Sequence, residues 1–111
     1  MYSVIITTRD LEKSFETIDI CENYIEVNFF KNLLKLIIKE KNEDIDSVFK
    51  KFLKDRAISP DFNSKTMNNI KCFVKTLKLK KELECNLNFY LVEKSNEKIV
   101  QFINYWFLDL C

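Results

Sequence analysis

The segment LEKSFETIDICENYIEVNF, residues 11–29, decides the fold class, because two secondary structures are compatible with it. After a capping Asp10, apolar residues recur at helical spacing: Leu11, Phe15, Ile18, Cys21 and Ile25. Alternatively, two strands flank a turn at Glu22 and Asn23, with apolar positions Phe15, Ile18, Ile20, Ile25, Val27 and Phe29. The β-branched residues in TIDI and YIEV favour strands, so we expect a hairpin here and keep the helix as the alternative.

Two other segments, residues 2–8 and 85–93, show strand patterns. The first is a β-branched run, YSVIITT, which is typical of a buried strand. The second alternates Leu87, Phe89 and Leu91 with asparagine and tyrosine, as a half-buried strand requires. Together with the hairpin expected at residues 11–29, these segments predict a small antiparallel sheet.

Three segments in the middle of the chain show the periodicity of amphipathic helices. We expect the first to begin at Asn28, the second to begin near Asn42, and the third to follow a linker at residues 59–64. Their apolar stripes are, in order, Phe29, Phe30, Leu33, Leu34, Ile37 and Ile38; Ile45, Val48, Phe49, Phe52 and Leu53; and Met67, Ile70, Phe73, Val74 and Leu77.

A fourth helix is expected after Ser95 and Asn96. Residues 99–110 are apolar nearly all round, so this helix would be buried on several sides or covered by another chain. These elements predict one α+β domain over residues 1–111, in which a small antiparallel sheet packs against three to four helices. An all-α bundle is the alternative, and it follows if residues 11–29 are helical.

The composition predicts an AT-rich source genome, a bias shared by phages, large DNA viruses, low-GC bacteria and some protozoa. The chain has no glycine, no histidine and one proline. No apolar run reaches the ~20 residues of a membrane span, and the first residues do not resemble a signal peptide, so we expect no membrane partner. We expect the cytoplasm, or the host cytoplasm if the protein is viral. The four cysteines lack paired spacing and are expected to be reduced core residues, with Cys111 as an exposed thiol: Cys21, Cys72, Cys85 and Cys111.

The missing residue types exclude many designs of active site. Without histidine the commonest general base and metal ligand is absent, and without glycine phosphate-binding loops and nucleophile elbows are excluded. Asp44 and Asp46 are candidates for a metal-dependent nuclease or hydrolase, but acids at a helix start also complement the helix dipole. We therefore expect no catalytic residue, no cofactor and no bound metal.

Charge and aromatic residues indicate where a partner binds. Residues 31–81 hold 14 basic and 6 acidic side chains, whereas residues 1–30 and 82–111 are both acidic overall. A row of lysines follows the third helix, and two aromatic residues of the types found in binding hot spots lie near the C-terminus. The candidate partner-binding residues are Lys71, Lys75, Lys78, Lys81, Tyr105 and Trp106.

These observations favour a non-catalytic accessory or inhibitor protein that binds a larger protein or ribonucleoprotein. The small size, the AT-rich bias and the lack of catalytic parts are typical of phage- or virus-encoded antagonists of host defence, such as anti-CRISPR proteins. The alternative is a small nucleic-acid-binding regulator that uses the face from Lys71 to Lys81. A homodimer through the C-terminal helix would bury its excess apolar surface.

Overall fold

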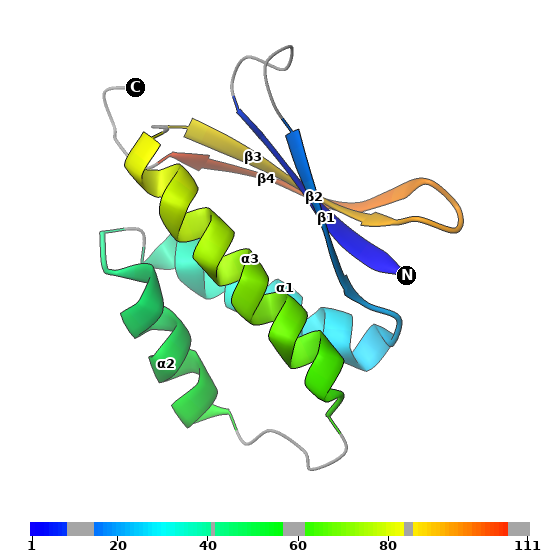
Figure 1. The fold of residues 1–111 in the computed structure, drawn as a ribbon, viewed down its shortest axis with the longest axis horizontal. Helices are drawn as coiled ribbons and strands as arrows, with labels where there is room; N and C mark the ends of the chain where they lie inside the picture. Colours follow the sequence, from blue (N-terminus) through cyan, green and yellow to red (C-terminus); the bar gives the residue numbers. More distant parts are fainter. Residues whose placement is uncertain (9–14, 41, 57–61, 84–85, 107–111) are drawn as a thin grey trace.

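The computed structural model describes residues 1–8, 15–40, 42–56, 62–83 and 86–106, and their side chains except at 8, 15, 81–83, 86 and 102–106. Within these ranges the chain forms a four-stranded antiparallel sheet and three helices, which lie together on one side of the sheet (Figure 1). The predicted α+β class is confirmed. The all-α alternative is wrong, because strand pairing satisfies the backbone at both ends of the chain.

The strands have the order β2-β1-β3-β4 in the sheet. Their bounds are Tyr2–Thr8 for β1, Phe15–Cys21 for β2, Asn86–Glu93 for β3 and Lys98–Trp106 for β4. β1 pairs with β2 on one side and β3 on the other, so the N-terminal and C-terminal hairpins join at the centre of the sheet. The expected strands at residues 2–8 and 85–93 are therefore present, the second one beginning at Asn86.

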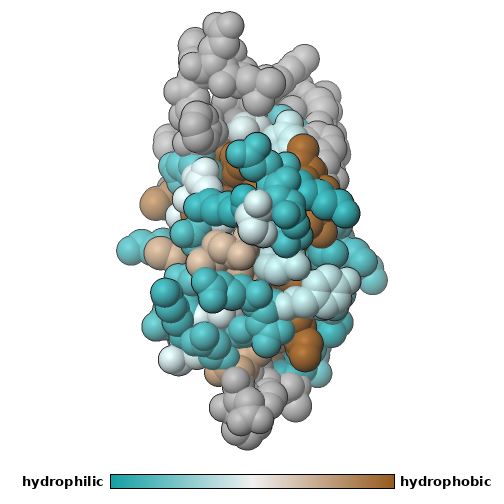
Figure 2. Space-filling model, turned by 90° about the vertical axis from the view of Figure 1, so that its right-hand side faces the viewer, coloured by the Kyte–Doolittle hydropathy of each residue, from teal (hydrophilic) through white to brown (hydrophobic). Residues whose placement is uncertain are grey.

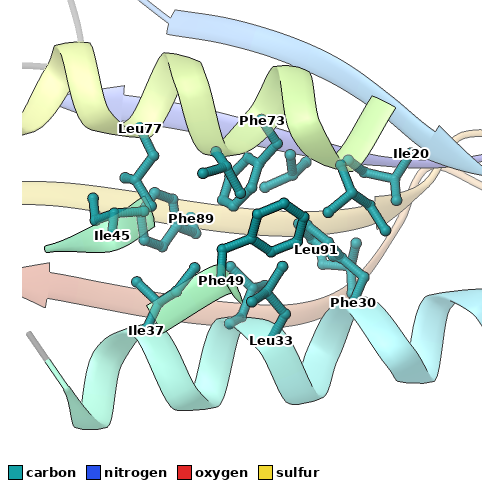
Figure 3. Close-up of a cluster of buried hydrophobic side chains, with 14 of the residues drawn as sticks. Ile20, Phe30, Leu33, Ile37, Ile45, Phe49, Phe73, Leu77, Phe89 and Leu91 are labelled. Atoms are coloured by element: carbon teal, nitrogen blue, oxygen red, sulfur yellow. The ribbon is translucent and has the colours of Figure 1, made fainter. Parts of the chain in front are cut away.

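The core lies between the sheet and the helices α1 and α3 (Figure 3). Phe73 of α3 meets Phe30 of α1 with ring centroids 5.0 Å apart, and Phe89 of β3 at 6.0 Å. Val4 of β1 is fully buried, as is Ile6 at 1% exposure, because alternate residues of a strand point to the same face. The sheet and the two helices thus share one group of aromatic and aliphatic side chains.

Helix α1, Tyr24–Lys39, begins five residues earlier than the stripe predicted. Asn23, and not Asn28, is its N-cap, with a side chain that accepts the Ile25 N–H at 2.8 Å. The expected second strand at residues 24–29 is therefore wrong. Val27 extends the buried helical stripe backwards, and the cap together with this packing overrides the β propensity of Ile25 and Val27.

The other two central helices are confirmed. In α2, Ile45–Asp55, Asp44 caps the first turn by accepting the Ser47 N–H at 3.3 Å. In α3, Ser64–Leu83, the predicted stripe faces the core at Ile70, Phe73, Val74 and Leu77. α2 packs against both α1 and α3, and Phe29 of α1 meets Phe52 of α2 edge to face at 4.8 Å.

The expected C-terminal helix is wrong, because residues 98–106 form β4. Residues 94–97 form the hairpin turn, closed by the Glu97 N–H donating to the Lys94 carbonyl at 3.4 Å. Glu97 adopts a left-handed conformation with φ 50°, which breaks the backbone away from a helical path. A segment that is apolar nearly all round is compatible with a strand as well as with a buried helix, and pairing with β3 decides for the strand.

The two described cysteines differ. Cys21 is buried, as expected of a core residue, whereas Cys72 is exposed on α3 and its expected place in the core is wrong. Cys72 directly precedes Phe73, so the helical rotation that buries the ring turns the thiol outwards. Cys85 and Cys111 lie outside the described residues. Among the described helices, none is long and apolar enough to cross a membrane.

Candidate functional site

A groove between α2 and α3 is the candidate functional site. Its cavity of about 400 Å³ has an apolar floor, formed by Phe49, Leu53 and Val74. Charged side chains stand around this floor: Asp46 and Lys50 from α2, and Lys71, Lys75 and Lys78 from α3. We call this feature the lysine groove.

The helical repeat explains why three lysines of α3 line the same side of the groove. Lys71, Lys75 and Lys78 are spaced by four and three residues, so they follow one side of α3 over about 10 Å. Val74 lies between them in sequence and is 3% exposed, packed beside Phe49 of α2, which is 8% exposed. Packing of these two apolar side chains therefore fixes the lysine row beside α2.

The groove carries an excess of positive charge. Asp46 accepts a short hydrogen bond and salt bridge from Lys78 Nζ, and both side chains are partly exposed. Among the described residues, none forms a salt bridge with Lys50, Lys71 or Lys75. Three ammonium groups thus surround the apolar floor without a compensating carboxylate from the described part of the chain.

The structure brings together half of the predicted partner-binding residues. Lys71, Lys75 and Lys78 lie in the groove, whereas the side chain of Lys81 is outside the described set. Lys80, the neighbour of Lys81, forms a 3.4 Å salt bridge with Glu16 of β2 and so turns towards the sheet.

Tyr105 and Trp106 belong to a different element from the one predicted. They lie in β4 and pair with Leu87 and Asn86 of β3, so their expected place on a helix is wrong. Their side chains are outside the described set. By backbone position they belong to the sheet, while the lysine groove belongs to the helices (Figure 1).

Lys50 is a groove residue that sequence reasoning missed. It follows Phe49 on α2 and precedes Leu53 by one helical turn, so a signal existed in its position beside the apolar stripe. That signal does not say which other helix lies opposite. Only the packing of α2 on α3 places Lys50 across from the lysines of α3.

Basic side chains continue around α2 beyond the groove. Lys51 and Lys54 are exposed on α2 itself. On its other side, a cavity of about 300 Å³ between α1 and α2 is lined by Lys35, Lys39 and Arg56, among others. The guanidinium of Arg56 lies 5.1 Å from the centre of the Phe52 ring. The charge asymmetry of the sequence therefore becomes a basic helical layer.

A third cavity, of about 380 Å³, lies where β2 meets α1 and the start of α3. Glu26 is 7% exposed there, and its carboxylate accepts the Asn63 N–H at 3.2 Å. Burial, reinforced by the charge of Glu26, raises the pKa of the Cys21 thiol to about 11, so this thiol stays protonated at neutral pH. These contacts join β2, α1 and α3, and they provide no activated nucleophile.

The carboxylates considered for catalysis have structural roles in this fold. Asp44 caps α2, and Asp46 pairs with Lys78. Within the described ranges, no group of three or more histidine, cysteine or acidic side chains is placed to hold a metal ion. No protein-family model, curated protein or solved structure matches the chain. The function is therefore inferred from the shape and charge of the lysine groove.

Proposed function

We propose that this protein is a non-catalytic binding module that holds an acidic segment of a larger protein in the lysine groove. The observation that carries the proposal is the juxtaposition of an apolar floor with lysines that form no salt bridge to another described residue. Lys50, Lys71 and Lys75 supply charge for carboxylates, while Leu53 and the small exposed part of Phe49 supply contact area for apolar side chains. An acidic amphipathic helix offers both kinds of group along one face.

The apolar floor favours a protein partner over a nucleic acid. Affinity in protein interfaces comes mainly from apolar side chains buried at the centre, and rim charges set the orientation and the rate of association. A phosphate backbone would contact the lysines and leave the exposed part of the floor, mainly Leu53, in contact with water. A protein partner that also covers the exposed part of the floor therefore gains more binding free energy than a ligand that contacts the lysines alone.

Binding of nucleic acid is the second candidate, and the extent of the basic layer favours it. Lys51 and Lys54 on α2, with Lys35, Lys39 and Arg56 beside it, widen the positive surface beyond the groove. Lysines neutralise phosphates without reading bases, and the chain has 2 arginines, Arg9 and Arg56, for base contacts. Such binding would be weakly dependent on sequence and strongly dependent on salt.

Two synthetic probes and one oligonucleotide separate these candidates. The first peptide is a helix with glutamates on one side and leucines on the other, and the second has the same charge with serines in place of the leucines. The protein proposal expects the first peptide to bind more tightly, with about tenfold loss in a Lys71→Glu, Lys75→Glu variant. Lys65→Glu, a single reversal of the same kind outside the groove on α3, is the control and should bind like the wild type.

Each outcome has a defined meaning. Equal affinity for the two peptides, or equal affinity of the groove variant and the control, contradicts the protein proposal. Tight binding of the oligonucleotide that falls linearly with the logarithm of salt concentration, and is lost in the groove variant, supports the second candidate instead. A metal-dependent or substrate-dependent turnover by the purified chain would contradict a non-catalytic role.

The composition suggests a biological setting for the same proposal. An inhibitor encoded by a phage or virus would act in the host cytoplasm, against a protein or ribonucleoprotein of the defence machinery. Purification of the tagged chain from host lysate, with nuclease and at moderate salt, tests this setting. Recovery of one defence complex by the wild type and the Lys65→Glu control, and not by the groove variant, is the expected result.

A further inference from the structure

Strand β4 is a long edge strand of unusual composition. It has 9 residues, and within the described ranges it pairs only with β3. Half of its backbone N–H and C=O groups therefore point away from the sheet, where they form a template for another strand. The sequence from Ile99 to Trp106, IVQFINYW, contains no charged residue and no proline. Natural edge strands usually carry such residues to prevent pairing.

The opposite edge, β2, carries charges along its length, whereas the sequence of β4 has its one charge at the first position, Lys98. Glu16 and Asp19 are exposed charges on it. Asp19 is held by Lys94 at 2.8 Å and by the Ser3 hydroxyl at 2.7 Å, and Lys80 reaches Glu16 from α3. Two copies paired through β2 would bring these charged clusters together. The difference between the edges indicates that β4 is the edge suited to pairing.

Within the described ranges no further strand pairs with the outer edge of β4, although Val100 of this strand packs against the core. Both α1 and α3 pack against β2, at the far edge. Figure 2 views the molecule from the side that carries the tip of the β3–β4 hairpin in Figure 1. The surface on that side is mainly hydrophilic, and its hydrophobic areas are small. The feature of β4 that a neighbour would recognise is its outer backbone edge, which has no strand partner within the described ranges.

We propose that β4 pairs antiparallel with β4 of a second copy, so that two four-stranded sheets join into one of eight strands. An antiparallel pair of identical strands is related by a twofold axis and is self-complementary. With full overlap, Phe102 lies at the axis and Lys98 lies opposite Trp106, so no like charges meet. The proposal is independent of the lysine groove. It replaces the expected dimer through a C-terminal helix, because the segment is a strand.

Sedimentation of the full chain over a concentration series, followed by cysteine cross-linking, tests the proposal. The background carries serine in place of Cys72, Cys85 and Cys111. Single cysteines are then placed in turn at positions 101, 102 and 103, with Lys54→Cys on α2 as the exposed control. The expected result is a concentration-dependent dimer and a disulfide-linked dimer from one of the three β4 positions, most readily Phe102→Cys, but not from the control.

A variant that leaves the strand intact gives a second measurement. Ile99 is 56% exposed at the start of β4, so Ile99→Lys adds an edge charge without opening the core, and Ile99→Thr is its neutral control. The dimer dissociation constant should rise about tenfold for Ile99→Lys and stay near the wild-type value for Ile99→Thr. A monomer at every concentration, a cross-link at Lys54→Cys alone, or an unchanged dissociation constant in Ile99→Lys would overturn the proposal. Pairing of β4 only with a strand of another protein would overturn it too.

Discussion

Replacement of Phe73 by alanine tests the packing of the core. The ring is fully buried between α1 and β3, with edge-to-face contacts to Phe30 and Phe89 (Figure 3). Truncation of a buried phenylalanine costs about 3–5 kcal/mol, of which each lost aromatic pair supplies about 0.5–1.5 kcal/mol. A chain of 111 residues has a total stability of about 6–17 kcal/mol, so the variant should fold and be much less stable.

Urea unfolding followed by far-ultraviolet circular dichroism measures this loss. The expected result for Phe73→Ala is a lower midpoint with a similar slope, because stability changes while the surface exposed on unfolding does not. Leu79→Ala is the matched control, since Leu79 lies on the same helix with 56% exposure and should change stability by about 0.5 kcal/mol or less. Equal losses in the two variants would refute the helical register in which Phe73 faces the sheet.

Three further predictions follow from polar groups. Hydrogen bonds from Lys94 and Ser3 lower the pKa of Asp19, so the stability that this carboxylate contributes is present above the ordinary aspartate pKa of 3.8 and is lost as pH falls through the lowered value. The difference in unfolding free energy between wild type and Asp19→Asn, measured by urea unfolding, should therefore shrink in acid. A difference that stays constant with pH would contradict this. Alkylation followed by peptide mass spectrometry should modify exposed Cys72 quickly and Cys21 only after unfolding, and equal rates would show that Cys21 is accessible. Asp44→Ala removes the N-cap of α2 and should cost about 1 kcal/mol in thermal or urea unfolding, whereas exposed Lys51→Ala should cost little.

Much of the helical layer could be predicted from local pattern. The stripes of α2 and α3 repeat at helical spacing within a single segment, and Asp44 precedes the first turn that it caps. The same local geometry places Lys71, Lys75 and Lys78 on one side of α3, so the residues that α3 contributes to the groove could be predicted from the sequence. Its binding role stays a prediction, because periodicity gives the direction of a side chain and not its partner.

The sequence by itself determined the β1 and β3 strands and the apolar faces of α2 and α3, since each depends on residues a few positions apart. It favoured the α+β class but left an all-α bundle open, and only strand pairing decided between them. The start of α1 and the conformation of residues 98–106 were decided by tertiary structure. Ile25 and Val27 favour a strand locally, and residues 99–106 are apolar in a helix or a strand alike. Lys50 faces the lysines of α3 only because α2 packs there. The strand β4 exists because β3 supplies its hydrogen-bond partners, and a ladder between two segments is a property of the assembled sheet and not of either segment alone.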